Sequence, residues 1–154
     1  GLEFDGEMGV GAAYFPGLDD MVAAAMGMGC WWNGRPTRVS AVSRLDEALL
    51  VYTDVGEIAA ERPGAWDRLR AATGLQRGFA DAYGGFMVAT GRADLAVDGI
   101  MKPWDCAALM PIVREAGGTF TDWNGTPTIS GGNGMSTNGH LLAAVVKVLE
   151  RERP

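Results

Sequence analysis

Residues 102–118 read Lys-Pro-Trp-Asp-Cys-Ala-Ala-Leu-Met-Pro-Ile-Val-Arg-Glu-Ala-Gly-Gly and predict one buried helix. Pro103 suits the first turn of a helix, and Gly117 with Gly118 can supply a left-handed exit. Apolar side chains cover nearly all sides of this helix, so we expect it to lie between other layers rather than on the surface. The stretch therefore indicates a fold built around an internal helix.

Asp105 lies at the start of that helix and has two interpretations. The first is a structural cap, because a carboxylate there is stabilised by free backbone N–H groups and by the positive end of the helix dipole. The second is a ligand, because a helix start holds a carboxylate rigidly in space. Residue type and position alone favour the cap.

The composition is that of a globular protein. The 154 residues are 47% hydrophobic and 21% charged, which is enough for one domain with its own core, and we treat residues 1–154 as a single unit. The net charge is -6 and the basic residues are scattered, which disfavours a nucleic-acid partner. No apolar stretch is long enough to cross a bilayer, and no signal peptide is visible, so we expect no membrane partner.

Cysteine and histidine usage narrows the chemistry. Cys30 and Cys106 are far apart and form no motif, which favours a reduced, cytoplasmic setting. His140 is the one histidine in the sequence, which excludes a His-rich metal cluster, and we propose no Ser-His-Asp or Cys-His arrangement. A metal bound here would be a hard ion held by carboxylates.

The order of predicted elements indicates an α/β fold. Asp5-Gly6 is typical of a hairpin turn, but fewer strand residues precede it than follow it, so we expect the chain to begin within a strand. Asn33-Gly34 predicts a second hairpin. Further along, we expect strands over 48–55, 93–97 and 119–122, and helices over 66–73, 79–90 and 141–149. Strands and helices that alternate in this way predict a layered α/β architecture.

The sequence motifs of the central stretch, residues 102–118, resemble those of a known family. Trp-Asp-x-Ala-Ala at 104–108, followed by Glu-Ala-Gly-Gly at 115–118, is similar to the C-terminal signature of the inositol monophosphatase family of magnesium-dependent phosphatases. The resemblance extends from Leu2 to about Leu149. It implies a layered αβαβα sandwich of which this chain is the second half, and it implies that Asp105 is a Mg²⁺ ligand.

Two further patterns resemble the histidinol-phosphate phosphatase branch of that family. They are Leu-x-Pro-Ile-Val at 109–113 and Thr-Asp-Trp-Asn-Gly at 121–125. The resemblance implies a Mg²⁺-dependent phosphomonoester hydrolase that acts on histidinol phosphate in histidine biosynthesis. The alternatives are an inositol-1-monophosphatase, a related sugar-phosphate phosphatase, or a non-catalytic domain of the same fold.

Asp81 and Asp98 are the candidate substrate-binding residues. Asp81 lies in an apolar segment where an unpaired charge is costly, so it either pairs with Arg77 or Arg92 or takes a cationic substrate group. By resemblance it suits the ammonium of histidinol phosphate. Asp98 is either a plain turn residue or, by resemblance, a contact to the part of the substrate remote from the phosphate. The family usually has a longer glutamate at that place.

The other metal ligands of the family lie in a first half that this sequence does not contain. Neither the family's Glu-Glu segment nor its Asp-Pro-x-Asp-Gly-Thr segment occurs in the chain. We therefore expect the chain by itself to be inactive as a phosphatase and to bind Mg²⁺ weakly. An uncovered strand edge and apolar face would favour self-association, so we also expect a homo-oligomer.

Overall fold

The computed structural model describes residues 1–78 and 81–150. The strands are β1 (Leu2–Phe4), β2 (Glu7–Phe15), β3 (Asp20–Ala25), β4 (Cys30–Trp32), β5 (Arg35–Thr37), β6 (Leu49–Tyr52), β7 (Leu75–Gly78), β8 (Leu95–Asp98), β9 (Thr119–Thr121) and β10 (Gly134–Thr137). The helices are the short 3₁₀ turn η1 (Leu45–Glu47), α1 (Val55–Glu61), α2 (Ala65–Ala72), α3 (Ala82–Ala89), α4 (Pro103–Glu115) and α5 (Leu142–Leu149).

The strands form two sheets. Sheet A is an antiparallel meander in the order β1-β2-β3-β4-β5. Sheet B has the order β7-β6-β8-β10-β9, in which β6 runs parallel to β7 and β8, while β10 runs antiparallel to β8 and β9. The parallel strands need crossover connections, and α1, α2 and α3 supply them.

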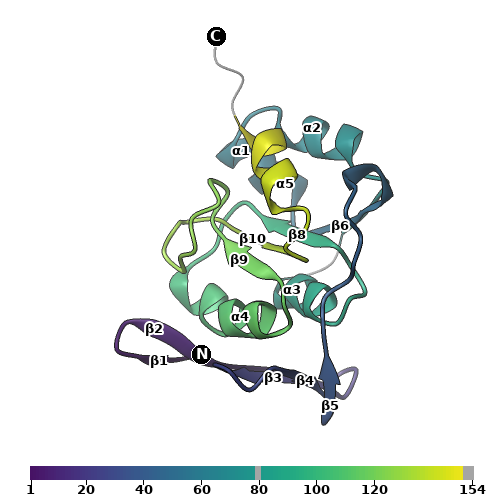
Figure 1. The fold of residues 1–154 in the computed structure, drawn as a ribbon. Helices are drawn as coiled ribbons and strands as arrows, with labels where there is room; N and C mark the ends of the chain where they lie inside the picture. The colour runs from purple at the N-terminus through teal and green to yellow at the C-terminus, as the bar shows by residue number, and fades with distance from the viewer. Residues whose placement is uncertain (79–80, 151–154) are drawn as a thin grey trace.

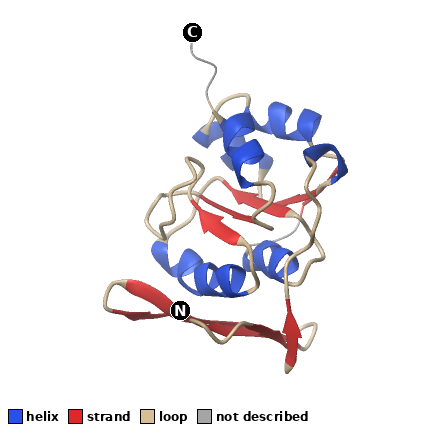
Figure 2. Ribbon diagram, in the orientation of Figure 1, coloured by secondary structure: helices blue, strands red, loops and turns tan. Residues whose placement is uncertain are grey.

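Sheets and helices stack in alternating layers (Figures 1 and 2). Helices α3 and α4 lie between sheet A and sheet B, and α1, α2 and α5 lie on the other side of sheet B. The layered α/β prediction is therefore confirmed, and the described residues form four of the five layers of the predicted αβαβα sandwich. None of the helices in the described residues is long and apolar enough to cross a membrane.

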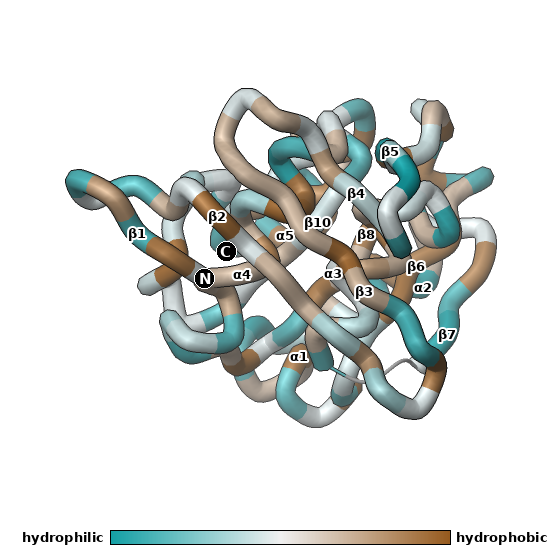
Figure 3. The backbone as a smooth tube through the Cα atoms, turned by 90° about the horizontal axis from the view of Figure 1, so that it is seen from below, coloured by the Kyte–Doolittle hydropathy of each residue, from teal (hydrophilic) through white to brown (hydrophobic). Residues whose placement is uncertain are grey.

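Helix α4 is the internal helix that the sequence predicts. Pro103 occupies its first turn, and Gly117 takes a positive φ of 89° just beyond its end. One apolar cluster joins α4 to the inner side of sheet A and to α3, with Ile112 and Val113 fully buried in it. Figure 3 shows sheet A from its outer side, with β2 and β3 crossing over α4 and α3.

A glycine in β2 sets the distance between sheet A and α4. A methyl group at Gly11 would overlap the carbonyl oxygen of Ala108 and would lie 2.8 Å from Cγ of Pro111. Both atoms belong to α4, and the first is backbone that cannot rotate away. The backbones of β2 and α4 therefore approach as closely as they do only because Gly11 has no side chain.

The segment between the two sheets is fixed by a buried polar network. Ser40 Oγ donates to Asp94 Oδ1 at 2.5 Å, and the backbone N–H of Leu49 donates to Asp94 Oδ2 at 2.7 Å. Asn138 Nδ2 donates to Ser40 Oγ and to the carbonyl of Val42. Because these groups satisfy one another, the chain passes from sheet A to sheet B in a defined path.

Two sequence-based boundaries need correction, and two strands were not expected. The strand expected over 48–55 ends at Tyr52, because Asp54 accepts a hydrogen bond from the N–H of Glu57 and starts α1. The helix expected over 79–90 is described from Ala82 onward, and residues 79–80 lie outside the described residues. The short strands β7 and β10 were not expected, and both belong to sheet B.

The close approach at Gly11 generates a stability prediction. Gly11→Ala should lower the free energy of unfolding by about 2–3 kcal/mol, because the added methyl has no room against the backbone of α4. Urea denaturation of the two proteins measures the difference. Gly9→Ala is the matched control in the same strand, since its methyl would meet only the ring of Phe4, which is 57% exposed and can turn aside. Equal losses in the two variants would contradict the argument.

Candidate functional site

A cavity of about 370 Å³ lies where two strand ends meet three helix starts. The parallel strands β6 and β8 end at its edge, with Thr53 and Asp98 at their carboxyl ends. Helices α1, α3 and α4 all begin beside it. Ligands of α/β proteins bind at the carboxyl ends of strands, and helix starts attract anions. The residues that border the cavity are Ala13, Thr53, Glu57, Asp81, Ala82, Asp98, Ile100, Met101, Trp104, Asp105, Ala108 and Leu109.

The structure brings all three residues singled out in the sequence to this cavity. Asp81 comes from the residue before α3, Asp98 from the end of β8, and Asp105 from the first turn of α4. They come from places far apart along the chain and are joined only by the fold. A fourth carboxylate, that of Glu57 in α1, borders the same space.

Asp105 makes the contact of a helix cap. Its Oδ2 accepts a hydrogen bond of 2.8 Å from the backbone N–H of Lys102, which fixes the carboxylate at the exposed rim of the cavity. The structure therefore confirms that Asp105 caps the start of α4. It leaves Oδ1 without a described hydrogen-bond partner among residues 1–78 and 81–150, so the same side chain can also serve as a ligand.

Asp98 is the most perturbed carboxyl group of the cavity. Burial raises the pKa of Asp98 from its ordinary value of 3.8 to about 6, against the opposing effect of a hydrogen bond from the hydroxyl of Thr53. The negative charges of Asp81, Glu57 and Asp105 raise the pKa further. Asp98 is therefore close enough to the other three carboxylates to be affected by their charges, and a perturbed carboxyl group in a cavity marks a candidate functional site.

Asp81 lies outside the helix in which the sequence analysis expected it. It immediately precedes α3, is exposed, and has a φ of 44° and a ψ of -136°. Such a backbone is strained for any residue but glycine, by roughly 1–3 kcal/mol. The ion pair with Arg77 or Arg92, one of the two alternatives for Asp81, is not found among the described residues. Arg92 lies 4.0 Å from Asp20, and Arg77 donates to the carbonyl of Gln76.

Glu57 and Thr53 were missed in the sequence analysis. A signal for Glu57 was available, because Asp54-Val-Gly-Glu57 follows the capping-box pattern in which an acidic residue stands three positions after the cap. The strand expected over 48–55 overlaps this pattern, and so the start of α1 was not predicted. Thr53 carries no comparable signal, since its role depends on the tertiary contact with Asp98.

Cysteine chemistry is excluded at this site. Cys106 follows Asp105 directly but is buried, and burial, together with the charges of Asp105 and Asp98, raises the pKa of its thiol to about 11. The thiolate needed for nucleophilic attack is then scarce at neutral pH. Cys106 packs in the core, where its sulfur contacts Met101.

The carboxylates fit part of a metal site rather than a whole one. Among the residues that the structure describes, no three Asp, Glu, His or Cys side chains are arranged so that they could hold a metal ion. A hard divalent cation takes six or more oxygen ligands, some of them water. Asp105 is suited to be one such ligand, and the described residues do not complete the set.

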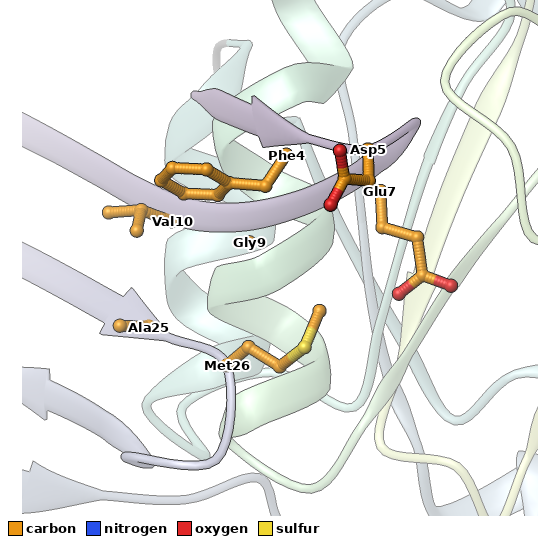
Figure 4. Close-up of a pocket in the computed structure, with 7 residues that line it drawn as sticks. All are labelled: Phe4, Asp5, Glu7, Gly9, Val10, Ala25 and Met26. Carbon is orange, nitrogen blue, oxygen red and sulfur yellow. The ribbon is translucent and has the colours of Figure 1, made fainter.

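A second hollow lies on sheet A and has a different character. Phe4, Asp5, Glu7, Gly9, Val10, Ala25 and Met26 line it (Figure 4). It is an open groove at the edge of the sheet, and its two carboxylates come from the β1–β2 turn and the start of β2. All its described lining residues belong to antiparallel strands or their turns and none to a helix start, so it is a weaker candidate for catalysis.

Comparison with known proteins identifies the family of the chain. Residues 1–152 match the model of the inositol monophosphatase family. The chain belongs to the inositol monophosphatase family. This confirms the family resemblance of the central stretch, and members of the family are phosphatases that are generally metal-dependent.

Individual relatives refine this picture. The chain is 42% identical to a histidinol-phosphatase of Chlorobaculum parvum over 99% of this chain and 61% of the relative. It is 34% identical to an inositol-1-monophosphatase of Synechocystis over 86% of this chain and 48% of the relative. An inositol monophosphatase structure from Zymomonas mobilis matches 92% of this chain and 57% of that chain, with a TM-score of 0.87 and 26% identity. The chain thus spans about half to three fifths of the length of these proteins.

The raised pKa of Asp98 generates a pH prediction. Between about pH 4 and pH 6 the folded chain binds more protons than the unfolded chain, so Asp98 makes stability fall as pH rises through that window. Asp98→Asn keeps the acceptor for Thr53 but carries no charge. It should be more stable than the parent sequence by about 2–3 kcal/mol at pH 7.5, and the gain should vanish below about pH 4.

Urea denaturation at several pH values in EDTA measures this difference without interference from metal. Asp67→Asn is the control, because Asp67 is exposed in the first turn of α2 and does not border the cavity. A variant at position 98 that is less stable than the parent sequence at pH 7.5 would show that the Asp98 carboxylate is not penalised by its surroundings.

Proposed function

We propose that residues 1–154 form the C-terminal part of a Mg²⁺-dependent phosphomonoesterase whose preferred substrate is histidinol phosphate. The observation that carries the proposal is the cavity at the ends of β6 and β8, bordered by four carboxylates and by the starts of α3 and α4. The similarity to a histidinol-phosphatase supports the substrate, and the family supports the reaction class.

The charge of the cavity supports a requirement for a cation. Its lining contains four carboxylates and no Lys, Arg or His among the described residues. A phosphate ester is an anion, and it would be repelled by this lining unless a positive ion stood between them. Asp105 would hold Mg²⁺, and the ion, when bound, would neutralise the phosphate and activate water.

The chain's own residues would do the rest of the binding. The N–H groups at the starts of α3 and α4 favour the phosphate. Asp81 and Asp98 would take the part of the substrate that leaves as the alcohol, because they stand at the cavity and lack cationic partners among the described residues. A substrate with an ammonium or imidazolium group satisfies these charges, whereas a neutral polyol does not.

An inositol-1-monophosphatase is the second candidate. The similarity to the Synechocystis enzyme supports it, and that relative is only a little more distant than the histidinol-phosphatase. A cytoplasmic location is part of the proposal and is supported by the two buried, unpaired thiols. The inactivity and the self-association expected of residues 1–154 alone stay predictions.

The assignment of Asp105 is tested by substitution in an enzyme of full family length that carries these residues, called here the parent enzyme. Asp105→Asn should lower the turnover of histidinol phosphate by about a hundredfold or more, because a metal ligand contributes several kcal/mol to the transition state. Folding should be retained, since the amide oxygen can still accept from Lys102 N–H. Asp67→Asn, at a helix first turn away from the cavity, should leave turnover unchanged.

The role of Asp81 is tested by two variants of the parent enzyme. Asp81→Asn removes the charge and keeps the shape, and it should reduce the preference for histidinol phosphate over inositol monophosphate by about tenfold. Asp81→Gly should reduce the preference equally, yet be no less stable than the parent, because glycine relieves the strain at a φ of 44°. Steady-state kinetics on both substrates and urea denaturation provide the two measurements.

Equal specificity constants for the two substrates in the unmodified parent enzyme would overturn the proposed substrate. A preference that survives in Asp81→Asn would leave the substrate standing but remove Asp81 from its recognition.

A further inference from the structure

Glu57 is a carboxylate of the cavity whose place in the first turn of α1 suits the helix dipole but does not engage its side chain with any described residue. Its backbone N–H donates a hydrogen bond to the side chain of Asp54. Its own side chain makes no hydrogen bond or ion pair within the part of the chain that the structure describes. The side chain is half-buried beside the cavity. A long acidic side chain held in that position, with no partner, is available to a ligand.

A glycine brings Glu57 to the cavity. A methyl group at Gly99 would lie 2.6 Å from the carbonyl carbon and oxygen of Glu57 and 2.8 Å from the N–H nitrogen of Ile58. These are backbone atoms of α1, so any side chain at Gly99 would push the first turn of α1 away from the end of β8. Asp98 thus contributes one carboxylate to the cavity, and Gly99, which has no side chain, leaves room for α1 to bring Glu57 to the same cavity.

The two carboxylates differ in what they can bind. Asp98 has a short side chain and already accepts the hydroxyl of Thr53, so part of its capacity to bind a cation is used within the protein. Glu57 has a longer side chain with more rotamers, and its carboxylate has no hydrogen-bond or ion-pair partner among the described residues. Trp104 stands at the same cavity with 77% of its surface exposed, and an indole face attracts cations and flat rings.

We propose that Glu57 is a specificity-determining residue that binds the cationic group of the leaving alcohol, with the indole of Trp104 as the adjacent wall. The ligand class is an amino alcohol phosphate whose alcohol carries an ammonium or imidazolium group. This inference rests on the proposed function, since it concerns the substrate of the same cavity. It adds a third recognition carboxylate, from α1, to Asp81 beside α3 and Asp98 at the end of β8.

The test uses the parent enzyme and the variant Glu57→Gln, which keeps length and shape and removes the charge. KM for histidinol phosphate should rise three- to tenfold with kcat within twofold, and KM for inositol 1-phosphate should stay within twofold. The effect on KM should shrink as salt is raised from 20 to 500 mM, because it arises from an accessible charge pair. Calorimetric titration with histidinol alone should show the same loss of affinity.

Glu47→Gln is the control, because Glu47 is exposed next to Arg44 and away from the cavity. It removes the same charge from the protein and should change neither constant. Thermal unfolding of all variants identifies a loss caused by misfolding.

The possible failures can be told apart. If the unmodified parent enzyme turns over neither substrate, or does not prefer histidinol phosphate, the proposed function fails. If it has that preference but Glu57→Gln retains it, this inference alone is overturned. Equal losses on both substrates, or a loss in kcat alone, would assign Glu57 to the metal or to folding and would also overturn it.

Discussion

The packing of α4 between the two sheets is the constraint on which the rest of the structure depends. On one side the backbone of α4 lies against Gly11 of β2, and at its end Gly118 lies so close to the carbonyl of Thr137 in β10 that a side chain would not fit. Glycines at both contacts replace side-chain packing with backbone contact. The helix can therefore shift very little, and whatever it carries at its two ends is held with the same precision.

The two ends of α4 serve different purposes. At its start, Asp105 is fixed at the cavity rim by the N–H of Lys102. At its end, the carboxylate of Glu115 accepts hydrogen bonds from Gly27 N–H at 3.0 Å and Gly29 N–H at 2.8 Å, and so holds the β3–β4 turn. One rigid element thus links the β3–β4 turn of sheet A to the position of a site residue at the opposite end of the helix.

The sequence allowed the fold around α4 to be predicted because its signals are local. Pro103, the apolar run and Gly117 mark a helix with a start and an end, and Asp5-Gly6 and Asn33-Gly34 mark hairpins that the structure contains. The short strands β7 and β10 could not be predicted in the same way. Their few residues acquire strand geometry from pairing with β6 and β8, which is information that lies elsewhere in the chain.

Three residues of the candidate site could be predicted from the sequence, but their geometry and environment could not. The resemblance to the family's sequence motifs indicated Asp81, Asp98 and Asp105 as site residues, and the fold brings them to one cavity. The backbone strain at Asp81 and the burial of Asp98 were beyond the sequence, because both arise from tertiary contacts. Glu57 was within reach of local capping rules, yet its relevance depends on Gly99, which acts only once α1 and β8 are packed together.

The site opposes stability, and the core must compensate for it. A strained backbone at Asp81 and a buried carboxyl at Asp98, opposed by the charges of Asp81, Glu57 and Asp105, raise the free energy of the folded chain without ligand. The glycine-mediated contacts of α4 and the apolar clusters on both sides of sheet B supply the opposing stabilisation. Cation binding would relieve the repulsion among the carboxylates, so ligand and fold should stabilise each other, and the cavity should be most rigid when its charges are balanced.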